Sequence, residues 1–233
     1  MKYLRFVLIP GVLFLLAGSG QAGWFTLYPS PSGNRLKSIS FLDNNTGYAV
    51  GDAGTILKMT DGGGGWVNHN SGTMTQLSGV HFPVDAQTGY AVGDSGTILK
   101  TTDGGWNWAK QTSGTTAGLL AVFFPVDAQT GYAAGSSGTI LKTTNGGGNW
   151  SSQNSGINLA LYSVHFPVNA QTGYAAGDSG RILKTTNGGM NWVRQGSATT
   201  EVLYSIHFPV DAQTGYAVGN NGTGRKTTDG GVS

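Results

Sequence analysis

The chain has 233 residues, of which 40 are glycine, none is cysteine and 10% are charged. This low charge excludes a disordered polyelectrolyte, and the many glycines are typical of a globular protein rich in turns. Without cysteine the protein has no disulfides, so an exported form depends on packing alone for its stability.

Residues 1–23 have the three parts of a secretory signal peptide. Two basic residues precede an apolar run from Phe6 to Ala17, and small residues follow around Ala22. The apolar run is short for a bilayer span. We therefore predict a signal peptide over residues 1–22. The mature protein is then exported, periplasmic or extracellular, and has no membrane span after cleavage.

Charge argues against nucleic-acid binding. Removal of the signal takes away Lys2 and Arg5, two of the 13 basic residues, and the remaining basic side chains then equal the 11 acidic ones in number. A protein without net positive charge lacks the usual electrostatic footprint of nucleic-acid recognition. We predict no nucleic-acid partner.

A unit of 42 residues recurs five times along the rest of the chain. A Gly-Tyr pair marks its phase, first at Tyr48 and last at Tyr216. The same step relates five aspartates or asparagines, five tryptophans and five lysines: Asp61, Asp103, Asn145, Asn187 and Asp229; Trp24, Trp66, Trp108, Trp150 and Trp192; and Lys58, Lys100, Lys142, Lys184 and Lys226. A fixed period of this size indicates a repeat fold.

Within one unit, short apolar segments alternate with turn residues. In the fourth copy they are LYSVHF (161–166), TGYAAG (172–177), GRILKTT (180–186) and NWVRQGS (191–197). Each has the composition of a strand, and the Pro, Asn, Asp and Gly between them favour turns. Four strands in about 40–45 residues make one blade of a β-propeller. We therefore predict an all-β propeller of five four-stranded blades.

The two ends of the repeat region are complementary. Residues 24–30, WFTLYPS, begin on the tryptophan of a fourth strand, and TTDGGVS ends where such a strand should begin. We expect residues 23–30 to complete the blade of residues 202–233 and to close a five-bladed ring. The other blades are expected at about 36–72, 76–114, 118–156 and 160–198, in one domain over 23–233. The alternative is part of a six- or seven-bladed ring.

Asp103, in the segment TTDGGWNW, has the setting of a catalytic acid or a metal ligand. Asn145 and Asn187 occupy the same position of the repeat. An amide can accept hydrogen bonds from a turn, but it cannot act as an acid, a base or a strong metal ligand. The role shared by all five copies is therefore structural. We predict that these side chains cap a turn while the tryptophans pack between blades.

The segment TTDGGWNW resembles the Asp-box of sialidase-type propellers. The combination GYAVG…GTILKTTDGG..W more specifically resembles the photosystem II assembly and stability factors, a family with BNR-type repeats. The resemblance covers nearly all of the chain after the signal. It implies a platform, similar to a chaperone, for intermediates of membrane-protein assembly. Two features differ, because members of that family have seven blades and an arginine-rich patch without a counterpart here.

His81, His165 and His207 stand at one position of the repeat, which Phe123 and Ser40 occupy in the other copies. Three imidazoles near an axis could bind a metal. Replacement by phenylalanine and serine favours a packing position instead, so we predict neither a metal nor a cofactor.

The five lysines have two interpretations. Their stems could pack along the blades with the ammonium groups in water. Alternatively, they form a ring of cations on one face, which would receive an anionic partner. The first is favoured, and the second makes these lysines candidate binding residues.

Catalytic groups are scarce. Glu201 is the one glutamate, whereas glycoside hydrolysis normally needs a close pair of carboxylates. The sialidase resemblance would also imply a cluster of arginines, but Arg35, Arg181, Arg194 and Arg225 stand at four different positions of the repeat. We predict that the protein is not an enzyme, and a sialidase-type glycosidase is the least favoured function.

The favoured function is an exported scaffold for protein interactions. Its expected partner is a protein, in the family's case a membrane-protein assembly intermediate, and the resemblance extends this to photosynthesis. We expect a monomer. The alternative is a glycan-binding propeller, because near-identical blades display equivalent pockets and multivalency amplifies weak affinity.

Overall fold

The computed structural model describes residues 32–62 and 64–232. They form five antiparallel sheets, one from each repeat, so the predicted five-bladed β-propeller is confirmed. Four sheets have four strands, and the fifth has three in the described residues. The segment predicted to complete the fifth blade, residues 23–30, and the predicted signal peptide lie outside the described residues.

Each blade is a meander whose strands follow in chain order. Blade 1 has β1 (Leu36–Phe41), β2 (Gly47–Gly51), β3 (Ile56–Met59) and β4 (Trp66–His69); blade 2 has β5 (Leu77–His81), β6 (Gly89–Gly93), β7 (Thr97–Thr101) and β8 (Ala109–Gln111); blade 3 has β9 (Leu119–Phe123), β10 (Gly131–Gly135), β11 (Ile140–Thr143) and β12 (Ser151–Gln153). Blade 4 has β13 (Leu161–His165), β14 (Gly173–Gly177), β15 (Ile182–Thr185) and β16 (Val193–Gln195), and blade 5 has β17 (Leu203–His207), β18 (Gly215–Gly219) and β19 (Gly224–Thr227).

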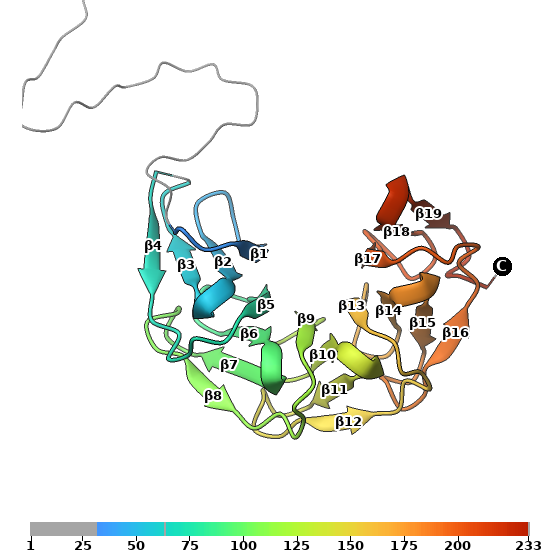
Figure 1. Ribbon diagram of the computed structural model, residues 1–233, viewed down its shortest axis with the longest axis horizontal. Helices are drawn as coiled ribbons and strands as arrows, with labels where there is room; N and C mark the ends of the chain where they lie inside the picture. The colour runs from blue at the N-terminus through green and yellow to red at the C-terminus, as the bar shows by residue number, and fades with distance from the viewer. Residues whose placement is uncertain (1–31, 63, 233) are drawn as a thin grey trace, which may run out of the picture.

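The blades follow one another along an arc, with the first strand of each on the inner side (Figure 1). The first strands contact one another in order, β1 with β5, β5 with β9, β9 with β13, and β13 with β17. Blades 1 and 5 form the two ends of the arc and face the same opening in Figure 1.

The connection between the second and third strands is more ordered than the sequence indicated. Each blade has one turn of 3-10 helix there: η1 (Asp52–Gly54), η2 (Asp94–Gly96), η3 (Ser136–Gly138), η4 (Asp178–Gly180) and η5 (Asn220–Gly222). Its central residue is left-handed in every copy, for example Ser137 with a φ of 54°. Alanine, serine and asparagine occupy this strained position, so the turn is held by its neighbours and not by the preference of one residue.

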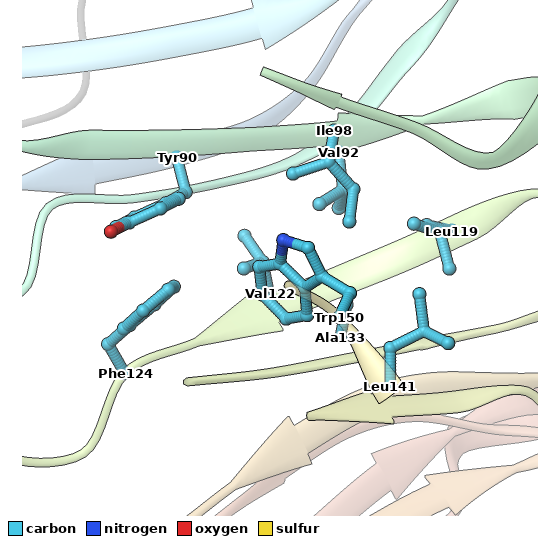
Figure 2. Close-up of a cluster of buried hydrophobic side chains, with 9 residues drawn as sticks. All are labelled: Tyr90, Val92, Ile98, Leu119, Val122, Phe124, Ala133, Leu141 and Trp150. Atoms are coloured by element: carbon cyan, nitrogen blue, oxygen red, sulfur yellow. The ribbon is translucent and has the colours of Figure 1, made fainter. Parts of the chain in front are cut away.

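The core lies between blades and not within them. Tyr90, Val92 and Ile98 of blade 2 meet a second group from blade 3, which comprises Leu119, Val122, Phe124, Ala133, Leu141 and Trp150 (Figure 2). Tyr90 stacks on Phe124 with ring centroids 3.9 Å apart, and Trp150 meets the edge of Phe124 at 6.1 Å. The Gly-Tyr pair of the repeat has its explanation here, because a Cβ at Gly131 would come within 2.4 Å of the Phe124 ring. Since each of the three inner sheets buries both faces against its neighbours, the residues on both faces of its strands must be apolar or small.

Blades 1 and 5, at the ends of the arc, each expose the sheet face that points away from the other blades. In blade 5, Tyr216 is 45% exposed and Val218 53% exposed, although the equivalent residues of inner blades are buried. In blade 1, Ile39 is 59% exposed and Phe41 50% exposed. These two faces are the ones that a closed five-bladed ring would bring together.

Candidate functional site

The five Asp-box side chains lie in the turns after the third strands. Asp103 Oδ1 accepts hydrogen bonds from the backbone N–H of Asn107 (2.9 Å) and from the Thr101 hydroxyl (2.8 Å). These bonds, together with one from the Asn107 side chain to Oδ2, lower the pKa of Asp103 to about 2. A carboxylate held ionised by turn donors is a poor general acid at neutral pH.

The asparagine copies make the same contacts. Asn145 Oδ1 accepts from the Asn149 N–H at 2.9 Å and from the Thr143 hydroxyl at 3.0 Å. Asn187 accepts from the Asn191 N–H at 3.0 Å. In the first and last blades, Asp61 and Asp229 accept from the N–H groups of Gly65 and Val232. The contacts agree with the predicted turn-capping role, which aspartate and asparagine fill equally.

The tryptophans of the repeat lie in different environments. Trp150 and Trp192 are buried, whereas Trp66 and Trp108 are half-buried. Trp66 meets the edge of Phe41 at 6.2 Å in the first blade, at one end of the arc. Trp24 lies outside the described residues.

Four of the five lysines connect successive blades. Each ammonium group lies about 5.5 Å from the ring centroid of the tyrosine in its own blade and donates a hydrogen bond to a glycine carbonyl of the next Asp-box: Lys58 to Gly104, Lys100 to Gly146, Lys142 to Gly188 and Lys184 to Gly230, at 2.7–2.9 Å. The hydroxyl of the same tyrosine donates to the same carbonyl, as Tyr90 does to Gly146. Burial lowers the pKa of Lys142 and raises the pKa of Tyr90 to about 12. These lysines therefore stabilise the contact between blades.

Lys226 is the exposed member of the set. It lies 5.8 Å from the Tyr216 ring centroid, on the open face of blade 5. The five lysines occupy equivalent positions of the repeat. Lys226 differs from the other four in its exposure, because it lies on a face of blade 5 that no described blade covers.

The predicted axial position forms a row of rings along the inner strands. His81, Phe123, His165 and His207 follow one another with ring centroids 4.6–4.9 Å apart. His81 Nδ1 accepts a hydrogen bond from the Phe124 N–H at 3.3 Å. Desolvation lowers the pKa of His81 to about 4 and also lowers the pKa of His165. Among the described residues, no group of three His, Asp or Glu side chains is placed to hold a metal ion.

A pair of tyrosines on the inner strands was not predicted from the sequence. Tyr162 of β13 and Tyr204 of β17 meet edge to face at 5.4 Å, and Tyr204 is 50% exposed. The pKa of the Tyr162 phenol is raised by burial first and by the carboxylate of Asp178, at the start of η4, second. Tyrosine gives large contact area at low entropic cost and a polar end for hydrogen bonding, which is why it is frequent in binding surfaces. The signal was visible as LYS in two successive copies, but their meeting depends on how blades 4 and 5 pack.

Shallow polar clefts lie between neighbouring Asp-boxes. One is lined by Lys100, Asp103, Asn107 and Asn145 between blades 2 and 3. An equivalent cleft includes Lys184, Asn187 and Asn191 in blade 4. Amide and hydroxyl groups in an open cleft are groups that a sugar could use, so these clefts are the places where the glycan-binding alternative would apply.

The chain matches the family model described as photosynthesis system II assembly factor YCF48. The matches run over residues 23–112, 70–151 and 111–197, so together they cover residues 23–197. The chain belongs to the YCF48 family. No sequence among the curated proteins matches it.

Solved structures of YCF48 have the same fold. YCF48 from Cyanidioschyzon merolae has a TM-score of 0.67 and 24% identity, over 86% of this chain and 69% of that one. YCF48 bound to a D1 peptide has a TM-score of 0.61 and 16% identity, over 87% of this chain and 81% of that one. The Niastella koreensis GH74 enzyme is also similar, with a TM-score of 0.64 and 16% identity, but this chain spans only 37% of it. In the part of the chain that the structure describes, no helix is long and apolar enough to cross a bilayer.

Proposed function

We propose that this YCF48-family chain is an exported, non-catalytic propeller that binds an extended segment of a protein partner on the inner side of its arc. The observation that carries the proposal is the pair of half-buried Tyr162 and exposed Tyr204 on adjacent inner strands. The relative solved with a D1 peptide supports a peptide as the kind of ligand. The partner would be a membrane-protein assembly intermediate, as in that family.

The chemistry of the described residues supports a binding role over catalysis. The Asp-box carboxylates accept hydrogen bonds within their turns, and four lysines donate hydrogen bonds to carbonyls of the next blade. The GH74 enzymes share the fold with this chain, but fold similarity alone does not carry an activity. Turnover of a fluorogenic glycoside by the purified chain would contradict the non-catalytic part of the proposal.

The test is a binding titration with a labelled D1 peptide, followed by fluorescence anisotropy. Replacing Tyr162 and Tyr204 together by alanine should weaken binding about tenfold or more, which is the range of aromatic residues at the centre of an interface. Met190→Ala, at an exposed position in the Asp-box turn of blade 4, is the control and should bind as the parent does. If the parent binds and the double variant binds equally well, the tyrosine pair is not the site.

The glycan-binding alternative has a separate test. If the clefts beside Asp103 and Asn187 are sugar sites, each should bind a sugar weakly, and several clefts together should bind a multivalent glycan more tightly. A glycan array at high protein density measures this directly. Binding there that Asn107→Ala reduces would replace the peptide proposal by a lectin function.

A further inference from the structure

The chain contains three Asn-Gly pairs, which are 145–146, 187–188 and 221–222. In such a pair the backbone nitrogen of the glycine can attack the asparagine side chain, because glycine has no Cβ that hinders the approach. The first two pairs belong to the Asp-boxes of blades 3 and 4, and the third lies in η5, between β18 and β19. The reacting groups are the same in all three pairs, so the fold decides which of them can react.

The two Asp-box pairs are held in place at both reacting groups. Asn145 Oδ1 accepts two hydrogen bonds within its turn, which fix the side-chain amide. The N–H of Gly146 is buried and donates to the Gln129 carbonyl at 2.9 Å. The N–H of Gly188 is also buried and donates to the Gln171 carbonyl at 2.9 Å. Attack by either nitrogen therefore requires the turn to open first.

The third pair lies in an open turn. Asn221 and Gly222 are both exposed and have φ values of 51° and 69°. A hydrogen bond of 2.9 Å from the Thr223 N–H to the Asn220 carbonyl closes the turn. Left-handed backbone at both central residues makes this a type I′ turn, for which Asn-Gly is a preferred sequence. The Gly222 N–H has no hydrogen bond to any described residue, so this nitrogen is accessible to solvent.

The side chain of Asn221 is also held less firmly than those of the Asp-box asparagines. Its Nδ2 donates one hydrogen bond, to Glu201 Oε2 at 3.0 Å. A single hydrogen bond at the surface contributes little net free energy, because water can replace it. A Cβ built on Gly222 would meet no heavy atom within 4 Å, so no neighbouring group blocks this side of the turn. The Asn221 amide can therefore turn towards the Gly222 nitrogen.

We propose that Asn221 is a site of spontaneous deamidation. The Gly222 nitrogen loses its proton to hydroxide and attacks Cγ of Asn221. The new N–Cγ bond closes a cyclic succinimide, while the Cγ–Nδ2 bond breaks and ammonia leaves. Water then opens the ring, either at the N–Cγ bond, which gives aspartate, or between the same nitrogen and the main-chain carbonyl carbon, which gives isoaspartate.

Either product changes the electrostatics at the start of blade 5. A carboxylate replaces the amide, so the hydrogen bond to Glu201 is lost and two negative charges become neighbours. Glu201 stands two residues before β17, the strand that carries Tyr204. The reaction therefore adds one negative charge close to the inner strand of this blade.

Peptide mapping by mass spectrometry tests the proposal on the unaltered chain. The protein is incubated at mildly alkaline pH, once folded and once unfolded in guanidinium chloride, and is digested at slightly acidic pH to stop the reaction. All three asparagines should react in the unfolded chain, which corrects for their different neighbours in sequence. In the folded chain Asn221 should keep most of its unfolded rate, whereas Asn145 and Asn187 should be slowed at least about tenfold by the need for local opening.

A matched variant identifies the product in the intact protein. Native anion-exchange chromatography should show a more acidic form that accumulates in the parent protein and does not accumulate in Asn221→Gln, because glutamine would have to form a larger ring. Two results would overturn the proposal. One is equal slowing of all three asparagines by folding, and the other is an acidic form as abundant in Asn221→Gln as in the parent protein.

Discussion

The interface between blades 2 and 3 and the open face of blade 5 have nearly the same sequence but different surroundings. Tyr90 and Val92 are fully buried between two sheets. Tyr216 and Val218 occupy the same positions of GYAVG and are about half exposed. The repeat therefore gives each blade two apolar faces. The side chains on a face are buried only where a neighbouring blade packs against it. This is the nearest-neighbour behaviour expected of repeat folds.

The largest effect should come from the tryptophan at the complete interface. Trp150→Ala should destabilise the protein by about 3–5 kcal/mol, because a large aromatic side chain is removed from a close-packed site. Urea unfolding followed by circular dichroism measures this. Trp150→Phe should be milder, since the buried indole N–H has no hydrogen-bond partner to lose. If Trp150→Ala were as stable as the parent protein, the interface between blades 2 and 3 would contribute no more to the free energy of unfolding than the exposed face of blade 5.

A pH titration tests the ring row at the same interface. His81 has a pKa of about 4 in the folded protein, against 6.5 for an ordinary histidine, because burial disfavours its charged form. Its contribution is fully present above pH 6.5 and decreases as the pH falls towards 4, by on the order of 3 kcal/mol. Thermal melts across this window measure it.

The control for that titration exchanges histidine for the residue of another blade. His81→Phe copies Phe123 and should reduce the decrease in stability between pH 6.5 and 4 to the part that His165, whose pKa is also lowered, contributes. His207→Phe, at the exposed end of the row, should leave the decrease in place. A decrease that is as large in His81→Phe as in the parent protein would have to come from another group.

Matched valines compare the two faces directly. Val92→Ala should cost about 2 kcal/mol, since it removes buried methyl groups and leaves a cavity. Val218→Ala should change the free energy of unfolding by less than about 0.5 kcal/mol, as surface substitutions usually do. Equal costs for the two substitutions, measured by urea unfolding, would show that the face of blade 5 is covered in solution.

The smallest effect should come from making blade 2 more like blade 3. Asp103→Asn copies Asn145 and keeps the acceptor for the Asn107 N–H, so the melting temperature at neutral pH should hardly change. Asp103→Ala removes the acceptor and should lower it. If asparagine were as damaging as alanine, the carboxylate charge would matter and turn capping would be an incomplete explanation.

The sequence by itself determined the blade. The 42-residue period, the four strand segments and the asparagines at the Asp-box position were enough to predict the fold and to argue that Asp103 is structural. These features are readable because strands and turns depend on residues close together in the chain. Trp150 and Trp192 were also expected between blades, and they are buried there.

Only the tertiary structure decided what lies between blades. Lys100 reaches a carbonyl 46 residues away, Tyr162 meets Tyr204 across two inner strands, and His81 is desolvated by its neighbours. No local pattern encodes these contacts, because they depend on the angle at which successive sheets pack. The same angle sets the curvature of the arc, and near-identical repeats can pack at slightly different angles without a change in blade sequence. For that reason the sequence predicted five blades, whereas the exposed faces of the first and last blades became visible only in three dimensions.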